Sequence, residues 1–97
     1  MRVTIELTGL ARDAVHQKEI RLELDEGATY GEIVRRLGEM YPRLIGLVID
    51  TDGDTLLSGN VLIINGDLAT PAMVMHECPQ DGTRLILMSL VTGGSGC

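Results

Sequence analysis

Two consecutive glycines near the C-terminus, Gly93 and Gly94, are the residues of this 97-residue chain with the clearest chemical meaning. They follow an apolar run and Thr92, so side chains that could pack end where the glycines begin. Glycine backbone adapts freely, and chain ends without packing contacts are mobile. We therefore expect a folded domain over residues 1–91 and a flexible tail over residues 92–97. Such a slim tail can enter a narrow enzyme channel and present the carboxylate of Gly94 to a partner.

Three further residues, Ser95-Gly96-Cys97, follow this glycine pair, so the carbonyl of Gly94 lies in a peptide bond as the chain is written. One interpretation is that the chain is a precursor, cut between Gly94 and Ser95 to free the carboxylate. A second is that the extension is an addition made by cloning or a handle for thiol labelling. A third uses Cys97 directly, as a sulfur-bearing or conjugated thiol at an accessible chain end.

Composition excludes several classes of function. Fourteen acidic against eight basic residues give a net charge of −6, which argues against nucleic-acid binding and suits docking to a basic groove on another protein. No apolar run approaches the roughly 20 residues of a membrane span, and the N-terminus lacks the apolar centre of a signal peptide. We therefore expect a cytoplasmic protein that binds no membrane. Its two cysteines are expected to be free thiols in a reducing compartment.

Two segments alternate apolar and polar residues with a period of two, residues 2–8 and residues 18–24. This period is typical of strands that bury one face. Residues 9–16 between them are polar and contain a glycine, which predicts a turn or an open hairpin loop. The two strands should therefore form an antiparallel hairpin with one solvated face.

One amphipathic helix is predicted over residues 30–40. Thr29 is a good N-cap and Glu32 stands three residues later, the spacing of a capping box. Pro42 ends the helix, because the residue before a proline disfavours helical backbone. Its apolar side chains recur at helical spacing, opposite the charged ones: Tyr30, Ile33, Val34, Leu37 and Met40.

The middle of the chain is less regular. Residues 44–50 are apolar and predict a short helical turn or a strand. Residues 50–54, Asp-Thr-Asp-Gly-Asp, resemble the start of a calcium loop, but its sixth and twelfth positions hold Thr55 and Val61 instead of glycine and glutamate. A hairpin turn is therefore the better interpretation, since Asp and Gly tolerate positive φ.

The last third of the chain predicts two more strands. Residues 61–64 are continuously apolar, and Asn65-Gly66 is a strong turn signal. Residues 68–79 are expected to form a loop, because their prolines limit strand pairing. Asp81-Gly82 predicts another turn, and residues 84–91 predict the final strand.

These elements indicate an α+β fold with a mixed sheet of four to five strands and one main helix packed on one face. On the final strand Leu85 and Leu87 would face the helix, which leaves Ile86, Met88 and Leu90 pointing outward. Contiguous exposed apolar residues usually mark a protein interface, so these three are the candidate partner-binding residues. Alternatively, a loop covers this face and the strand is buried on both sides.

No metal site is expected. The candidate zinc ligands His76, Cys78 and Cys97 number at most three, are widely spaced, and include one on the tail. His76 is better read as a solvated loop residue.

The order and spacing of these segments resemble the ubiquitin-like β-grasp family. Within it, the chain is most similar to bacterial and archaeal sulfur carriers, such as the small subunit of molybdopterin synthase and the thiamine sulfur carrier. The resemblance reaches Gly94 and rests on the helix end Met40-Tyr41-Pro42-Arg43-Leu44, the turn Asp50-Thr51-Asp52-Gly53, the strand and turn Asn60-Val61-Leu62-Ile63-Ile64-Asn65-Gly66, and the closing segment from Asp81-Gly82-Thr83-Arg84-Leu85 to Thr92-Gly93-Gly94.

The resemblance implies a carrier that is not itself an enzyme and binds no cofactor. An E1-like adenylating enzyme would use ATP to activate the carboxylate of Gly94, and a sulfur donor, a sulfurtransferase or desulfurase, would convert it into a thiocarboxylate for an acceptor synthase subunit. Gly93 would supply the slim backbone beside the reacting carbonyl. Most sulfur carriers stop at the second glycine, so the extension implies processing, as by a JAMM-type zinc metalloprotease in related systems.

Two other functions compete with the sulfur carrier. The chain could be a ubiquitin-like protein modifier joined to its targets through Gly94, because modifiers share the same tail and activation step. It could also be a β-grasp interaction module whose glycine tail has no chemical role. Which pathway would receive the sulfur is not encoded in these features.

Overall fold

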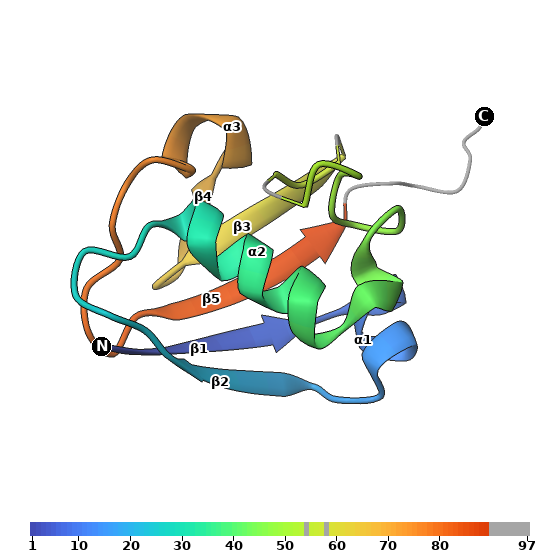
Figure 1. The fold of residues 1–97 in the computed structure, drawn as a ribbon, viewed down its shortest axis with the longest axis horizontal. Coiled ribbons are helices and arrows are strands. Elements are labelled where there is room, and N and C mark those ends of the chain that lie inside the picture. The colour runs from blue at the N-terminus through green and yellow to red at the C-terminus, as the bar shows by residue number, and fades with distance from the viewer. Residues whose placement is uncertain (54, 58, 90–97) are drawn as a thin grey trace.

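The computed structural model describes residues 1–53, 55–57 and 59–89, and shows an α+β fold built on one mixed five-stranded sheet (Figure 1). The strands lie in the spatial order β2-β1-β5-β3-β4. Their bounds are Arg2–Leu7 for β1, Glu19–Glu23 for β2, Asn60–Ile64 for β3, Asp67–Ala69 for β4 and Arg84–Ser89 for β5. The predicted fold class is therefore confirmed.

The first and last strands are neighbours in the centre of the sheet. β1 pairs with β5 in parallel, and every other neighbouring pair of strands is antiparallel. The predicted hairpin of β1 and β2 is present, in a register that pairs Val3 with Leu22 and Ile5 with Ile20. Because residues paired across strands share a face, the alternating sequences place their aliphatic side chains together on the inner face.

Helix α2, Tyr30–Met40, lies across this inner face (Figure 1). It begins as predicted, because the backbone N–H of Glu32 donates a hydrogen bond to Oγ1 of Thr29 at 3.2 Å. It ends before a short 3₁₀ turn, Pro42–Leu44. The core beneath it is aliphatic, and its most deeply buried large side chains include Ile5, Leu44 and Leu85.

The connection between β1 and β2 is a short helix, α1, Gly9–Val15, so the predicted turn or open loop is wrong. Ala11 on this helix is 2% exposed, and Ala14 and Val15 pack partly against the core. These residues stand at the three- and four-residue spacing of a helix, but they are too few to mark one against the polar residues between them. The helix ends at His16, whose φ is 63°.

The segment after β3 is also more regular than predicted. Asn65 and Gly66 form the expected tight turn, with φ of 49° and 92°. This turn brings the chain back along β3 as the short strand β4, and helix α3, Pro71–Val74, follows it. The loop predicted over residues 68–79 was wrong here because Pro71, which prevents strand pairing, is well suited to the first position of a helix.

The predicted hairpin turn at residues 50–53 is present. The N–H of Asp50 donates to the carbonyl of Thr55 at 2.8 Å, and Gly53 has a φ of 78°. The preceding apolar stretch holds the buried Val48 and Ile49 and forms isolated bridges rather than a strand. In the described part of the chain, no helix is both long enough and apolar enough to cross a membrane.

Candidate functional site

The candidate site begins where β5 leads toward the C-terminus. β5 is the central strand of the sheet and is described as far as Ser89. Its parallel pairing with β1 and antiparallel pairing with β3 hold both of its edges. The predicted residues of the tail, the processing site and one docking position lie outside the described residues: Leu90, Thr92, Gly93, Gly94, Ser95 and Cys97.

The root of the tail is therefore anchored to the body of the domain by β5. Leu87 is 2% exposed, and its carbonyl accepts a hydrogen bond from Oγ1 of Thr8 at 2.8 Å. Further along the strand, Ser89 pairs with Asn60 of β3. The end of the described chain is thus held at the centre of the sheet.

Asn60 beside this root carries an unpaired polar atom. Its side chain is 7% exposed, and Nδ2 donates to the carbonyl of Leu57 at 2.9 Å. Its Oδ1 is buried and has no hydrogen-bond partner among the described residues. An unsatisfied buried acceptor costs about 1–3 kcal/mol, so this position is a local weak point of the fold.

The outer face of β5 belongs to a larger apolar surface. Ile86 and Met88 are half-buried and lie on the face away from α2, as the alternation predicted. Met88 pairs with Val61, Ile86 pairs with Ile63, and Ile63 pairs with Leu68 of β4. Leu68 is 71% exposed. We call these five side chains, Val61, Ile63, Leu68, Ile86 and Met88, the apolar outer patch.

The contribution of β3 and β4 to this patch was not predicted from the sequence pattern. Residues 61–64 were recognised as a continuous apolar strand, but such a run does not alternate and so does not indicate an exposed face. Val61 and Ile63 are outward because their neighbours Asn60, Leu62 and Ile64 pair with the inward positions of β5. Side chains alternate between the two faces of a strand, so a continuously apolar strand must place half of them on the face away from the helix. This alternation was the feature of the sequence from which the outward residues could have been predicted.

Charged side chains occupy the other half of the outer face. Arg84 precedes Ile86 on β5, and its Nη2 lies 2.8 Å from Oε2 of Glu19 on β2. Arg21 lies 3.4 Å from the same carboxylate. The hydrogen bond and charge of Arg84 hold the pKa of Glu19 below its usual value. These are exposed ion pairs, so we expect them to influence specificity more than stability.

The candidate zinc ligands give no metal centre in the described part of the chain. His76 and Cys78 are exposed, and the thiol of Cys78 lies 3.3 Å from the carbonyl of Gly27. No group of three His, Cys, Asp or Glu side chains able to hold a metal occurs among the described residues.

The family model of the ThiS family matches residues 5–94 of this chain. This chain belongs to the ThiS family. The match begins within β1, covers every later element through β5, and includes Gly93 and Gly94. The predicted resemblance to the sulfur-carrier branch of the ubiquitin-like proteins is thereby confirmed. Proteins of this kind are generally non-catalytic carriers that work with E1-like enzymes and synthase subunits.

Solved structures show the same fold in this ThiS-family member. SAMP1, the small archaeal modifier protein 1 of Haloferax volcanii, is 24% identical with a TM-score of 0.81, over 97% of this chain and 100% of that one. Urm1 from Trypanosoma brucei is 22% identical with a TM-score of 0.75, over 96% and 95% of the two chains. A chain from Pyrococcus furiosus assigned as molybdopterin converting factor, subunit 1, is 19% identical with a TM-score of 0.69, over 93% and 98%. No protein of curated function matches significantly.

Proposed function

We propose that this protein is a sulfur carrier whose reactive group is the carboxylate of Gly94, freed by removal of Ser95-Gly96-Cys97. The observation that carries the proposal is the extent of the ThiS-family match, which runs to Gly94 and leaves out those three residues. Gly94 is thus the last position at which this chain follows its family. Cleavage of the Gly94–Ser95 bond would create the chain end that the chemistry needs.

In the proposed reaction, the Gly94 carboxylate attacks ATP on an E1-like adenylating enzyme, forming an acyl-adenylate and releasing pyrophosphate. The terminal sulfur of a persulfide on the donor enzyme would then displace AMP, giving an acyl disulfide between Gly94 and the donor. A second thiol of the donor would attack the donor's sulfur in that S–S bond, forming a disulfide within the donor and releasing the Gly94 thiocarboxylate. The carrier supplies neither acid nor base. Glycines at 93 and 94 leave the carbonyl carbon unobstructed, which allows the partner to align the attacking atom.

The apolar outer patch is the proposed docking surface for the adenylating enzyme, with Leu90 continuing it along the chain. The enzyme must hold the body of the carrier while the tail enters its active site. Ile86 and Met88 lie on β5, the last strand before the predicted tail, and are partly exposed, so contacts there would fix where the tail starts. The neighbouring Arg84 and Glu19 would form a polar rim.

Substitution of Met88 by Asp tests this surface. We expect Met88→Asp to weaken ATP-dependent activation while the protein stays folded, because the carboxylate would keep part of its contact with water in the free protein and lose it in the complex. The matched control is Met73→Asp, which places the same charge at a methionine that is 77% exposed on α3. Equal activation of the two variants would contradict docking at this patch. Unfolding of Met88→Asp would show that Met88 belongs to the core.

A protein modifier is the second candidate function. The β-grasp folds of SAMP1, a small archaeal modifier protein, and of Urm1 are compatible with it. In that case an amine of a target, rather than sulfur, would displace AMP from Gly94. High-mass conjugates that require an intact Gly94 would distinguish a modifier from a carrier. A mere interaction module would instead keep its function after Gly94→Ala.

The primary test is the intact mass of the untagged protein from its native cell. A chain that ends at Gly94 with one oxygen replaced by sulfur is the expected result. A processed chain without sulfur would favour the modifier and direct the search to conjugates. A full-length chain that still ends in Cys97 would contradict the proposed processing. The Gly94→Ala variant is the control, and its mass shows where the unprocessed chain appears.

A further inference from the structure

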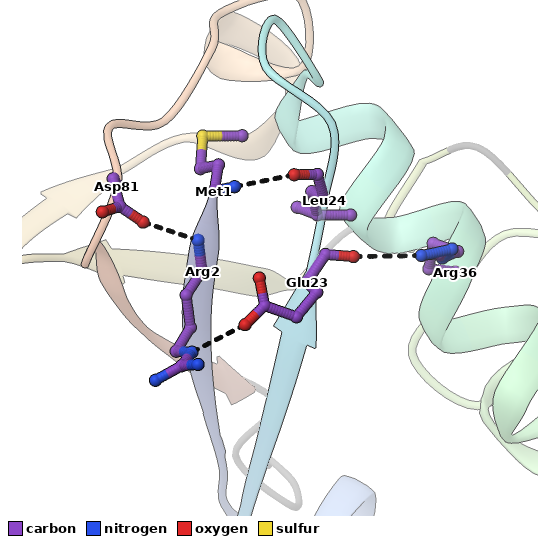
Figure 2. Close-up of polar contacts among 6 residues, drawn as sticks. All are labelled: Met1, Arg2, Glu23, Leu24, Arg36 and Asp81. Atoms are coloured by element: carbon purple, nitrogen blue, oxygen red, sulfur yellow. Dashed lines mark hydrogen bonds and ion pairs between the residues drawn. The ribbon is translucent and has the colours of Figure 1, made fainter.

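One end of the outer face of β1 and β2 carries a matched pair of charges. Met1 and Leu24 exchange two backbone hydrogen bonds, at 2.9 and 2.7 Å, and Figure 2 shows the one that the terminal amine donates. In antiparallel strands such hydrogen-bonded pairs alternate with pairs whose side chains come closer together. Arg2 and Glu23 form the next pair, of this close type, and Nε of Arg2 lies 2.8 Å from Oε1 of Glu23. Charge and register therefore agree at this end of the sheet.

The other end of the same two strands carries like charges. Glu6 pairs with Glu19, an even number of positions from the pair of Arg2 and therefore of the same close type. Two carboxylates that face each other across strands in this way destabilise a sheet. Glu19 is compensated, because Arg84 and Arg21 lie 2.8 and 3.4 Å from its carboxylate oxygens.

Glu6 has no such compensation. Its side chain is half-buried, and it has no hydrogen bond or ion pair with any other residue that the structure describes. The two nearby arginines of the outer face, Arg21 and Arg84, bind Glu19 instead. Because β1 lies between β2 and β5, this unpaired carboxylate stands in the interior of the outer face rather than at an edge.

Glu6 also lies beside the apolar outer patch. It pairs with Ile86 of that patch, one strand spacing away, about 4.8 Å. A partner that covers Ile86 therefore removes water from the Glu6 carboxylate as well. Taking a carboxylate out of water is costly unless an opposite charge meets it. Docking at the patch thus requires a cation at this position of the partner.

We propose that Glu6 is a specificity-determining residue of this docking surface and receives an arginine side chain of the adenylating enzyme. A guanidinium suits the position better than an ammonium, because it is more weakly hydrated and can donate two parallel hydrogen bonds to one carboxylate. The partner surface would combine apolar side chains over Ile86 and Met88 with one arginine over Glu6. The inference rests on the docking surface proposed above and deepens it by stating the charge that the partner must carry.

The enzyme is favoured over a second copy of this chain as the source of that arginine. A second copy that docked through the same face would present Arg2, Arg21 and Arg84, and each of these is already in an ion pair of its own chain. Binding Glu6 would therefore break an existing pair. The net charge of −6 on each copy opposes such an association further.

Binding of the full-length chain to the adenylating enzyme, measured by calorimetry without ATP, tests the assignment. Gly94 is blocked by Ser95 in this chain, so docking is measured without reaction. Glu6→Gln keeps the size of the side chain and removes its charge, and we expect the dissociation constant to rise about tenfold. Glu39→Gln is the matched control, because it removes the same charge from an exposed position on α2 and should bind like the wild type. Equal affinities of the two variants would overturn the inference.

Stability separates recognition from a structural role. Glu6→Gln relieves the like-charge contact with Glu19, so the urea midpoint of unfolding should stay the same or rise. A fall in the midpoint would show that Glu6 stabilises the fold, and would overturn its assignment to a partner.

Charge reversal tests the choice of an arginine. Glu6→Arg should raise the dissociation constant about a hundredfold, because two cations would then meet in the complex. Arginine-to-glutamate variants of the enzyme are next made one at a time. One of them should restore the binding of Glu6→Arg while weakening that of the wild-type chain. If no variant does so, the partner residue is not an arginine and the inference is wrong.

The remaining outcomes distinguish this inference from the proposed function. Pyrophosphate release from the chain that ends at Gly94 measures activation separately. Release together with equal affinities of Glu6→Gln and Glu39→Gln leaves the proposed function intact and overturns the inference. No release, with selective weakening by Glu6→Gln, means that activation fails while the docking surface is supported. No binding of the wild-type chain would overturn the inference, as would a wild-type dimer, seen by light scattering, that Glu6→Gln dissociates.

Discussion

The two faces of strand β5 are both apolar, yet they have different surroundings. Leu85 and Leu87 on the inner face are 1% and 2% exposed, beneath α2. Ile86 and Met88 on the outer face are only half-buried and lie beside Val61 and Ile63. The same strand thus contributes to the core on one side and to an accessible surface on the other.

This contrast separates stability from recognition within one strand. Burial on the inner face lowers the free energy of folding, because the leucines are removed from water. The outer side chains gain little from folding and still have apolar area to bury against a partner. The consequence is that neighbouring residues on β5 should respond very differently to substitution.

The largest effect is expected on the inner face. Leu87→Ala removes a side chain that is 2% exposed and leaves a cavity. Such substitutions cost about 2–5 kcal/mol of unfolding free energy. Urea denaturation followed by circular dichroism measures this. A loss below about 1 kcal/mol would mean that the inner face tolerates a cavity and that the contrast is weaker than inferred.

A smaller loss is expected from the start of the helix that covers this face. Thr29→Ala removes the side-chain oxygen that accepts a hydrogen bond from the N–H of Glu32. We expect a loss of about 1 kcal/mol in unfolding free energy. Thr29→Ser is the matched control, since it keeps the hydroxyl group and should retain most of the stability. Equal losses in both variants would argue against capping as the cause.

Truncation on the outer face should have less effect again. Met88→Ala is expected to change the unfolding free energy by only about 0.5 kcal/mol, because the side chain is already partly in water. The same denaturation experiment on Met88→Ala and Leu87→Ala gives the contrast directly. Equal losses would show that the outer face is part of the core.

The smallest effect concerns the charged half of the outer face. Arg84 lowers the pKa of Glu19 in the folded protein, so the ionised carboxylate contributes stability above the usual glutamate pKa. That contribution is lost as the pH falls through the lowered pKa. Glu19→Gln should therefore reduce the dependence of unfolding on pH in this acidic range only. An unchanged profile would show that Glu19 and Arg84 are too solvent-exposed to matter.

Local rules predicted much of this fold. The alternation in β1 and β2, the Thr29 cap and the Asn65-Gly66 turn each depend on neighbouring residues, and all three are present. The failures were short elements. Helix α1 and strand β4 carry too few periodic residues to signal themselves, and packing against the rest of the chain stabilises them instead.

By itself the sequence determined the β-grasp class, the family and the inward leucines of β5. These follow from periodicity, segment order and residue identity. Only the tertiary structure decided that Val61, Ile63 and Leu68 join Ile86 and Met88 in one patch. Strand order and register decide such neighbours, and they depend on contacts between residues far apart in the chain.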